Sequence, residues 1–257
     1  MKLTIQTPKG LYQYKLKIIY EGIKRIDKKI SKENLLLFNE IAHKNKLRFG
    51  LVYGTLLGAI REKDFINHDE DIDLFIIRND LDLFKSILFD LREYGFEVVR
   101  YDRRDGLCSI MRKGEYIDIY IFSPLIDGVY ETLGDPIPEK YILDLLYYDF
   151  QGEKFLAARD AEESMMFFYG ETWNTPIETK PYYLSTFKKL KVKFSWWLYF
   201  SIPDFIFNPI MEKRSIRKSI RYNYRAERLN KLLGREVIPT IPLNCYRIKK
   251  CTFFPAP

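Results

Sequence analysis

Apolar residues recur along the first part of the chain with two different periods, and these periods predict interleaved helices and strands. In residues 31–46 they recur every three or four positions, which predicts an amphipathic helix with Ser31 as its N-cap. Residues 49–53 form a short apolar run, which predicts a strand that ends at Gly54. Residues 55–62 then predict a small helix.

The same two patterns continue to about residue 125. Residues 71–78 predict a second strand, and the amphipathic helix that follows is expected to begin at Asn79 or Asp80 and to end at Gly95. Strands and helices therefore interleave, which predicts an α/β (α+β) fold with a mixed sheet flanked by helices. Three more β-rich runs predict one strand and a hairpin about Lys113 and Gly114: residues 96–101, 107–112 and 115–122.

The next segment predicts a second hairpin and a short helix. The hairpin turn is expected at Gly152. Asp160 is followed three residues later by Glu163, which predicts a capping box for a helix that ends at Gly170.

The last third of the chain has a different character. Residues 186–200 alternate as a strand would, yet their aromatic residues also recur at helical spacing, and the length of the segment favours a helix. After Pro203, residues 211–234 predict a strongly basic helix, and the proline-rich remainder is expected to be extended or poorly ordered.

The length and composition of the chain fit one domain large enough to hold a catalytic site, followed by an appended portion. The chain has 257 residues, of which 47% are apolar, and we expect a domain over residues 1–180 followed by a basic, aromatic-rich helical portion over residues 181–257. No stretch approaches the roughly 20 apolar residues that cross a bilayer, and the first ten residues lack the apolar segment of a signal peptide. Three scattered cysteines without metal-type spacing favour the cytoplasm (Cys108, Cys245 and Cys251).

The net charge of +7 hides an asymmetry. Residues 181–257 hold 16 Lys and Arg against 4 Asp and Glu, a local charge of +12, whereas residues 1–180 carry a charge of −5. A basic portion with interleaved aromatic residues admits nucleic-acid binding as one interpretation, and an ordinary solvated surface as another.

The sequence HDEDIDLFIIR, at residues 68–78, joins an acidic cluster to an apolar strand. Asp71 and Asp73 are two residues apart, so their side chains point to the same face of the strand. Two converging carboxylates repel one another unless a cation neutralises them, and oxygen ligands suit Mg²⁺ or Mn²⁺. The alternative is an exposed acidic loop before an ordinary strand.

Two other features favour phosphate chemistry. Gly54 and Thr55 stand where a strand turns into a helix, and there a phosphate can approach backbone N–H groups. Asp118 interrupts an otherwise apolar strand, and a buried carboxylate needs a partner, which could also be a nearby Lys or Arg. Together with the acidic pair, these features predict a phosphoryl- or nucleotidyl-transfer site.

The segment GTLLGAIREKDFINHDEDIDLFI (residues 54–76) resembles the signature of the LicD family, the phosphorylcholine transferases related to fukutin and fukutin-related protein. YIDIYIF (residues 116–122) looks like the later strand of that family with its third acid. FFYGETWNTP (residues 167–176) is similar to its downstream Tyr-Gly-acid-aromatic-Pro element. The resemblance covers residues 31–176 and excludes the basic C-terminal portion.

The resemblance implies a nucleotidyltransferase-like fold and a set of site residues. Asp71 and Asp73 would coordinate Mg²⁺ or Mn²⁺, Asp118 would complete the site as a ligand and proton acceptor, and Asp69 would be an additional ligand. Residues expected at the nucleotide and phosphates are Gly54, Thr55, Gly58 and Arg61, with an ion pair from Arg61 to Asp64 or Glu62 as the alternative for that side chain.

The implied reaction transfers a phospho-alcohol, with phosphocholine from CDP-choline favoured, to a sugar hydroxyl of a cell-surface glycan and releases CMP. The glycan would belong to lipopolysaccharide, capsule or teichoic acid. Departures from the family pattern, such as Asn67 and His68 where Pro-Trp is frequent, leave the substrate open. Nucleotidyl transfer to a small molecule or RNA is the second interpretation, and non-enzymatic nucleic-acid binding is the third.

The basic C-terminal portion suggests a cellular location for the enzyme. Lysines between residues 188 and 193 flank Trp196 and Trp197, and basic and tryptophan side chains both favour an anionic membrane surface. We therefore expect peripheral association with the inner face of the cell membrane, where a lipid-linked acceptor would lie. The alternative is that these aromatic residues pack on the catalytic domain.

Overall fold

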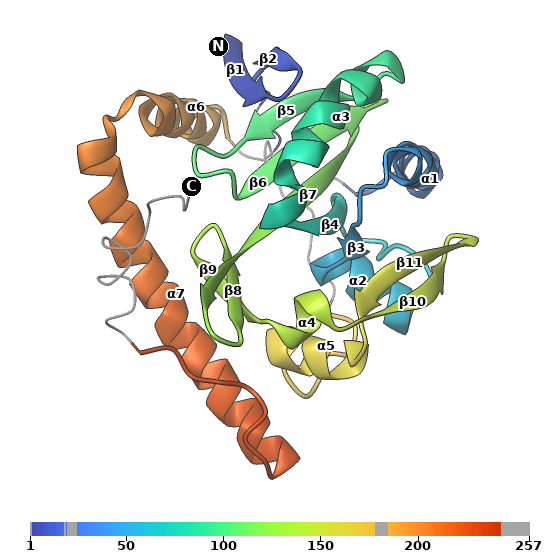
Figure 1. The fold of residues 1–257 in the computed structure, drawn as a ribbon, viewed down its shortest axis with the longest axis vertical. Helices are drawn as coiled ribbons and strands as arrows, with labels where there is room; N and C mark the ends of the chain where they lie inside the picture. The colour runs from blue at the N-terminus through green and yellow to red at the C-terminus, as the bar shows by residue number, and fades with distance from the viewer. Residues whose placement is uncertain (1, 18, 20–24, 178–184, 243–257) are drawn as a thin grey trace.

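Strands that lie far apart in the sequence form one mixed sheet. The computed structural model describes residues 2–17, 19, 25–177 and 185–242. In the sheet the central strands follow the order β10-β11-β3-β4-β7-β6-β5, and the pairs β11–β3 and β4–β7 are parallel whereas the others are antiparallel. The predicted mixed sheet is thereby confirmed (Figure 1). Its strands are β3 (Gly50–Leu51), β4 (Ile72–Ile77), β5 (Glu97–Tyr101), β6 (Leu107–Arg112), β7 (Glu115–Ile126), β10 (Leu145–Phe150) and β11 (Glu153–Ala158).

Both faces of the sheet are buried, as the alternating side chains of β4 show. Ile72, Leu74 and Ile76 lie in a core with helices α1 (Lys28–Lys44) and α3 (Leu81–Glu93), which cover one face. Phe75 alternates with them and lies in a second core on the other face. That second face carries Asp73 as well, because Asp73 and Phe75 are two residues apart. The site is therefore built on the face opposite α1 and α3.

Short elements cover the second face. The hairpin of β8 (Val129–Thr132) and β9 (Asp135–Pro138) continues from β7, and it was not predicted from the sequence. Helices α2 (Tyr53–Arg61), α4 (Lys140–Leu143) and α5 (Ala161–Tyr169) lie around the β3 and β11 side of the sheet (Figure 1). A separate hairpin of β1 (Lys2–Thr7) and β2 (Gly10–Lys15), which the pattern also did not predict, packs beside β5 and α3.

Within residues 185–242, the C-terminal portion contains two helices that lie along one side of the molecule (Figure 1). The ambiguous segment forms helix α6 (Thr186–Ser201), so the strand interpretation was wrong. Helix α7 (Asp204–Leu233) begins directly after Pro203, earlier than predicted, and contains Pro209 near its start. Its residues Tyr222, Ala226 and Leu229 are buried in the second core. The boundary at residue 180 stays a prediction.

Two predicted helix caps were wrong. Asp27, not Ser31, caps α1 by accepting a hydrogen bond from the N–H of Ile30, and Ser31 is buried inside the helix. Glu163 does not close a capping box with Asp160, because its carboxylate accepts a hydrogen bond from Tyr141 (2.6 Å) and pairs with Lys140. Across the described helices, none is both long and apolar enough to cross a bilayer. Cys245 and Cys251 lie outside the described residues.

Candidate active site

Strand pairing brings two of the predicted acids side by side. The parallel register of β4 and β7 sets Asp73 directly opposite Asp118. Adjacent strands are about 4.8 Å apart, so the two side chains stand next to one another on the second face of the sheet. Asp73 is 7% exposed and Asp118 is fully buried, so both carboxylates sit in surroundings that disfavour unneutralised charge.

Gly54 and Thr55 hold both the side chain and the backbone of Asp73 in place. The Gly54 N–H donates a hydrogen bond to Oδ2 of Asp73 (2.9 Å), and the Asp73 N–H donates one to Oγ1 of Thr55 (2.8 Å). The Gly-Thr pair at the start of α2 therefore orients the acid, whereas the sequence had suggested phosphate contacts. Thr55 is 2% exposed, which fits a positioning role.

Gly54 also makes room for a second carboxylate. A Cβ at this position would clash with Oδ2 of Asp69 and would lie 3.1 Å from Oδ2 of Asp73. Asp69 and Asp73 therefore converge on the space beside the Gly54 backbone. The loop that carries Asp69 is fixed there by backbone hydrogen bonds from the Ile26 N–H to the Asp69 carbonyl (2.8 Å) and from the Asp69 N–H to the Ile66 carbonyl (3.1 Å).

The environment of Asp73 disfavours its charge. Burial raises the pKa of Asp73 well above its usual value, and the neighbouring charges of Asp69 and Asp118 raise it further. Hydrogen bonds from the Gly54 N–H and from the Tyr120 hydroxyl oppose this effect.

Asp71 and Asp69 share this environment. Burial raises the pKa of Asp71 well above its usual value, and the charges of Asp73, Asp118 and Asp69 add to the effect, while Arg100 opposes it. Burial also raises the pKa of Asp69, whereas the hydrogen bond from the Glu70 N–H and the nearby His68 lower it. The three carboxylates thus form an acidic cluster, defined as Asp69, Asp71 and Asp73, that is stable in its ionised form only beside a positive charge.

For Asp118, the chain itself provides the neutralising positive charge. Its Oδ2 lies 2.5 Å from Nη2 of Arg100, and its Oδ1 accepts a hydrogen bond from the Ser109 hydroxyl at 2.5 Å. Arg100 in turn donates from Nε to the Ser109 oxygen (2.9 Å). Registers pair Ser109 with both Asp118 and Arg100, so one polar row runs across four strands: Asp73, Asp118, Ser109 and Arg100.

Sequence reasoning missed Arg100 and Ser109, although a signal for Ser109 existed. A two-residue turn at Lys113 and Gly114 fixes the hairpin register, and that register pairs Ser109 with Asp118. Arg100 could not be found in this way, because a bulge shifts the register of β5 against β6 between Val98 and Arg100.

Aromatic side chains enclose the acidic cluster. The Tyr53 ring packs edge-on against Tyr120 (centroids 4.9 Å apart) and Phe168 (5.1 Å). Burial raises the pKa of Tyr169, with further contributions from the charges of Asp73 and Asp69, so this hydroxyl also lies near the cluster. Tyr53 has a φ of +46°, which is strained for a bulky residue, and such strain often accompanies a functional site.

Two predicted phosphate-binding residues have structural partners. Arg61 pairs with Glu62 (2.7 Å) and donates a hydrogen bond to the Trp173 carbonyl (3.2 Å), which agrees with the ion-pair alternative. Gly58 allows α2 to approach the following loop, since a Cβ there would lie 2.5 Å from the Asp64 carbonyl oxygen. In this structure Arg61 links α2 to Trp173, and Gly58 lets α2 pack closely on the loop at Asp64.

The donor set suits a hard divalent cation. Within the described residues, no group of three or more His, Cys, Asp and Glu side chains is arranged to hold a metal ion by itself. Mg²⁺, however, is usually bound by one or two carboxylates together with substrate phosphates. Asp69 and Asp73 converge beside Gly54, all donors are carboxylate oxygens, and the repulsion within the cluster is what a cation relieves. The residues present therefore fit Mg²⁺ or Mn²⁺.

The part of the chain that carries this site is similar to a known protein family. Residues 46–124, which hold the acidic cluster and Asp118, match the family described as LicD/FKTN/FKRP, nucleotidyltransferase domain. A segment of the chain is 38% identical over 52 residues to the lipopolysaccharide cholinephosphotransferase LicD of Haemophilus influenzae, which is 20% of each protein. An uncharacterised protein of Rickettsia prowazekii is 30% identical over 120 residues, which is 46% of this chain and 43% of that protein. The chain thus matches less than half the length of these curated relatives.

Two solved structures are distantly similar. The lincomycin-bound lincosamide antibiotic adenylyltransferase LnuA is 12% identical, with a TM-score of 0.40, over 63% of this chain and 93% of that chain. The antibiotic-resistance factor ANT(2'')-Ia is 14% identical, with a TM-score of 0.42, over 60% of this chain and 78% of that chain.

Proposed function

We propose, from the premise that residues 46–124 belong to the LicD/FKTN/FKRP nucleotidyltransferase domain family, that the protein transfers a phospho-alcohol from a CDP-alcohol to a sugar hydroxyl and releases CMP. The single observation that supports this most is the convergence of Asp69 and Asp73 beside Gly54, with Asp118 in register on the next strand. Phosphoryl transfer of this kind needs positioning and charge neutralisation more than covalent help from the protein. The name of one relative, lipopolysaccharide cholinephosphotransferase, supports CDP-choline as the proposed donor and a cell-surface glycan as the proposed acceptor.

Each residue of the site has a role in this proposal. Asp71 and Asp73, with Asp69 beside them, would hold Mg²⁺ or Mn²⁺, which when bound neutralises charge on the diphosphate of the donor. The Gly54 N–H and the Thr55 hydroxyl keep Asp73 in the orientation that this requires.

Asp118 would accept the proton of the attacking sugar hydroxyl. We prefer this role to that of a metal ligand, because the Arg100 guanidinium already neutralises the carboxylate, which therefore does not require a metal ion. Each carboxylate oxygen keeps a further lone pair beside the hydrogen bonds from Arg100 and Ser109, so a proton can still be taken up.

Removing divalent metal should abolish CMP release, and adding Mg²⁺ or Mn²⁺ should restore it. Because the pKa values of Asp71 and Asp73 are raised, protons compete with the metal, so the metal concentration that gives half-maximal rate should fall as pH rises. The measurement is CMP release against metal concentration at several pH values. Full activity in excess chelator would contradict the proposed metal site.

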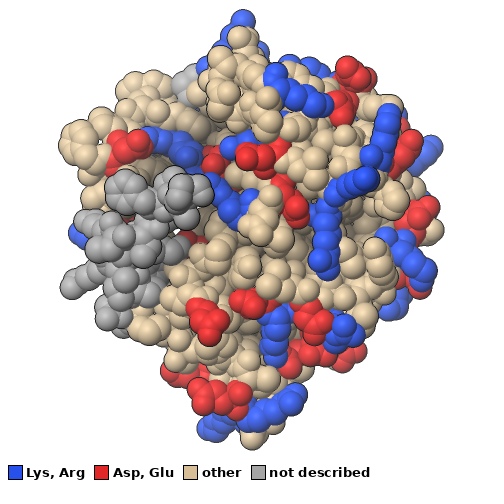
Figure 2. Space-filling model, in the orientation of Figure 1, with Lys and Arg blue, Asp and Glu red and all other residues tan. Residues whose placement is uncertain are grey.

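The second candidate, nucleotidyl transfer, shares the same residues and differs in its product. Release of pyrophosphate from a nucleoside triphosphate would favour it, whereas CMP from a CDP-alcohol favours phospho-alcohol transfer. Nucleic-acid binding receives less support. On the face shown in Figure 2, the Lys and Arg side chains of the described residues lie among Asp and Glu side chains.

The proposed site of action is the anionic inner face of the cell membrane, reached through α6. No residue of α6, which lies wholly in the described part of the chain, is buried. Lys188, Lys191 and Lys193 are exposed beside an apolar stripe, so the helix offers both charge and interfacial aromatic groups. The stripe consists of Phe187, Leu190, Phe194 and Trp197, each at least 55% exposed.

Vesicle flotation tests this location. The protein should bind anionic vesicles at low salt, and replacing Lys188, Lys191 and Lys193 together by Gln should weaken binding roughly hundredfold, at about 1 kcal/mol for each lysine. A matched triple variant on α1, which lies on the opposite side of the molecule in Figure 1, should bind normally (Lys29, Lys32 and Lys44 to Gln). Equal binding to neutral and anionic vesicles would overturn the membrane proposal.

A further inference from the structure

A cavity of about 520 Å³ lies between the sheet and the two C-terminal helices. It is bounded by β5, the loop that joins β5 to β6, the β8–β9 turn, α6 and α7. Its chemistry is set by four cationic and two aromatic side chains, beside several aliphatic ones: Arg100, Arg104, Arg214, Lys218, Trp196 and Tyr199. The Arg100 guanidinium reaches Asp118, the neighbour of Asp73 in the sheet, so the cavity adjoins the acidic cluster, although no residue of that cluster lines it.

The cationic groups outnumber the acids in the cavity wall. Asp102 is its acidic lining residue, and its carboxylate is already engaged by the Tyr199 hydroxyl and by the backbone N–H of Arg104 (2.8 Å). Lys218 donates a hydrogen bond to the Leu133 carbonyl (3.3 Å) and lies 3.7 Å from Asp135. Positive charge therefore remains in excess in the cavity, and an anion is the ligand that balances it.

Arg104 is the group that most needs a partner. Its Nε and Nη2 atoms are shielded from solvent, yet they make no hydrogen bond within the described part of the chain. The nearest carboxylate oxygen, Oδ2 of Asp102, lies 4.0 Å from Nε, which is too far for a hydrogen bond. Buried N–H groups without an acceptor are unfavourable, above all on a charged group, so an acceptor from outside the chain would be bound favourably.

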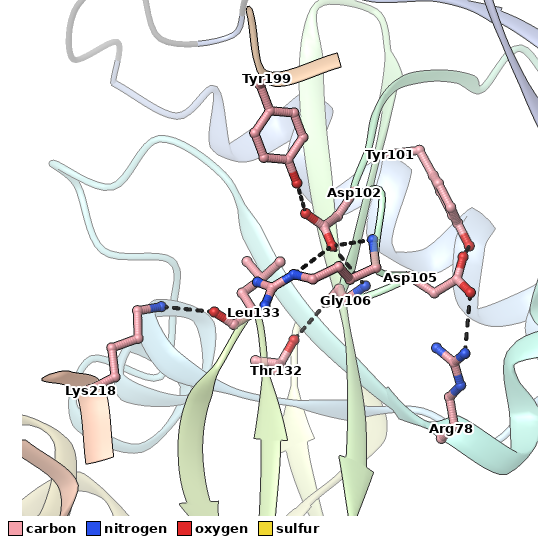
Figure 3. Close-up of polar contacts among 10 residues, drawn as sticks. Arg78, Tyr101, Asp102, Asp105, Gly106, Thr132, Leu133, Tyr199 and Lys218 are labelled. Atoms are coloured by element: carbon pink, nitrogen blue, oxygen red, sulfur yellow. Dashed lines mark hydrogen bonds and ion pairs between the residues drawn. The ribbon is translucent and has the colours of Figure 1, made fainter. Parts of the chain in front are cut away.

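The cavity is built by specific polar contacts. Figure 3 shows Tyr199 pointing at Asp102 from α6, and Lys218 reaching across to Leu133 from α7. On the far side of the loop, Thr132 donates a hydrogen bond to the Gly106 carbonyl (2.6 Å).

Arg103 fastens the helices to the same loop. Its Nη1 donates to the carbonyls of Tyr199 (2.7 Å) and Ile202 (2.8 Å), and its guanidinium lies over the Phe207 ring. The cavity walls are therefore held in position by the chain itself, which reduces the cost of ordering them when a ligand binds.

We infer that this cavity binds an organic phosphate, with its phosphate or diphosphate at Arg104 and its flat or apolar body against Trp196 and Tyr199. The inference rests on the proposed function and deepens it, because both substrates of such a transfer can carry this chemistry. A lipid-linked acceptor, which is an apolar diphosphate ester, is the occupant that we infer, because the diphosphate of the donor, a nucleoside diphosphate ester, is already assigned to the acidic cluster.

Three properties of the cavity favour this class of ligand. A guanidinium fork matches a phosphate with two parallel hydrogen bonds. Arg100 and Lys218 lie near carboxylates of their own, Asp118 and Asp135, so the cationic groups left for a ligand are Arg104 and Arg214. The volume lies within the range of small-molecule sites, and aromatic walls suit a planar base or an aliphatic chain.

Calorimetric titration of the full chain in excess chelator tests the inference. Without metal, the acidic cluster repels phosphates, so binding there is suppressed. The probes are CMP for the donor source, farnesyl diphosphate for the acceptor source, and inorganic pyrophosphate. At least one organic probe should bind the wild type, and Arg104→Gln and Trp196→Leu should each weaken that binding tenfold or more.

Matched controls lie on α7. Tyr224 is 68% exposed on α7 and Arg217 is exposed on the same helix, and neither lines the cavity, so Tyr224→Leu and Arg217→Ala should bind the probe as the wild type does. Circular dichroism and melting curves show whether Arg104→Gln and Trp196→Leu keep the fold, and Arg104→Lys provides a second variant that retains the charge but lacks the fork.

The outcomes separate the two possible sources and the two proposals. CMP binding that depends on Arg104 and Trp196 assigns the cavity to the donor, and farnesyl diphosphate binding with that dependence assigns it to the acceptor. Binding of no organic probe, equal binding to folded Arg104 and Trp196 variants, or equally tight binding of pyrophosphate would overturn the inference. These titrations need no turnover, so an inactive protein that binds would contradict the proposed transferase alone, and an active protein that does not bind would contradict the cavity alone.

Discussion

Asp73→Asn should abolish CMP release and, at the same time, raise the melting temperature of the metal-free protein. The activity falls because the substitution removes a charge that holds the cation. The stability rises because the folded environment raises the pKa of Asp73, so its ionised form is less favourable in the folded state than in the unfolded chain. A raised carboxyl pKa stabilises the fold at low pH and loses that contribution as pH rises through the folded-state value, and Asn keeps the neutral form at every pH.

The measurement is a pair of assays in the same buffer above pH 7. CMP release with Mg²⁺ should fall to background, and the melting temperature in chelator should rise by about 2–4 °C for each kcal/mol gained. Asn retains an oxygen that accepts the hydrogen bond from the Gly54 N–H, so the fold is preserved. The control is Asp149→Asn, whose side chain is 83% exposed in an ion pair with Lys154, and it should change neither quantity. Lower stability with normal specific activity would show that Asp73 is structural.

Asp118→Ala should destabilise the protein strongly as well as slow it. The substitution leaves the Arg100 guanidinium buried without its carboxylate, and breaking a buried pair in this way costs about 3–5 kcal/mol. A simple alanine variant would therefore confuse loss of folding with loss of catalysis. The informative variants are Asp118→Asn and the doubly neutral Arg100→Gln with Asp118→Asn.

The double variant separates the two roles of Asp118. Asp118→Asn should lower the melting temperature, and removing both charges should reverse most of that decrease, because no unpaired charge remains in the core. CMP release should stay about 10²-fold or more below wild type, the range expected for a positioned acid–base group. If the double variant recovers activity together with stability, Asp118 serves only to neutralise Arg100. Ser109→Ala should have a smaller effect on both quantities, because it removes the hydrogen bonds of Ser109 to Asp118 and Arg100 but leaves the ion pair between them.

Local patterns predicted the sheet and the acidic cluster well, because both depend on short-range periodicity. Alternation along residues 71–78 placed Asp73 on the face of Phe75, and the two-residue turn at Lys113 fixed the hairpin of β6 and β7. The two missed hairpins, β1–β2 and β8–β9, have mixed polarity on at least one side, so the apolar signal is weak there.

Those local patterns could not predict which strands pair when they lie far apart in the sequence. The neighbourhood of Asp73 and Asp118 arises from a parallel pair of strands that α3, β5 and β6 separate in sequence. Likewise, the ion pair of Arg100 depends on a bulge, and the cavity at Arg104 depends on how α6 and α7 dock on the β5–β6 loop. Sequence periodicity carries no information on such contacts.

The central claim is the transfer of a phospho-alcohol with release of CMP, and one measurement tests it directly. The purified chain is incubated with Mg²⁺ and a panel of CDP-alcohols that includes CDP-choline, and CMP is quantified over time beside the Asp73→Asn variant. We predict CMP release, even if slow in the absence of acceptor, from at least one CDP-alcohol with the wild type and none with the variant. No CMP from any donor, with pyrophosphate released instead from a nucleoside triphosphate, would contradict the claim and assign the site to nucleotidyl transfer.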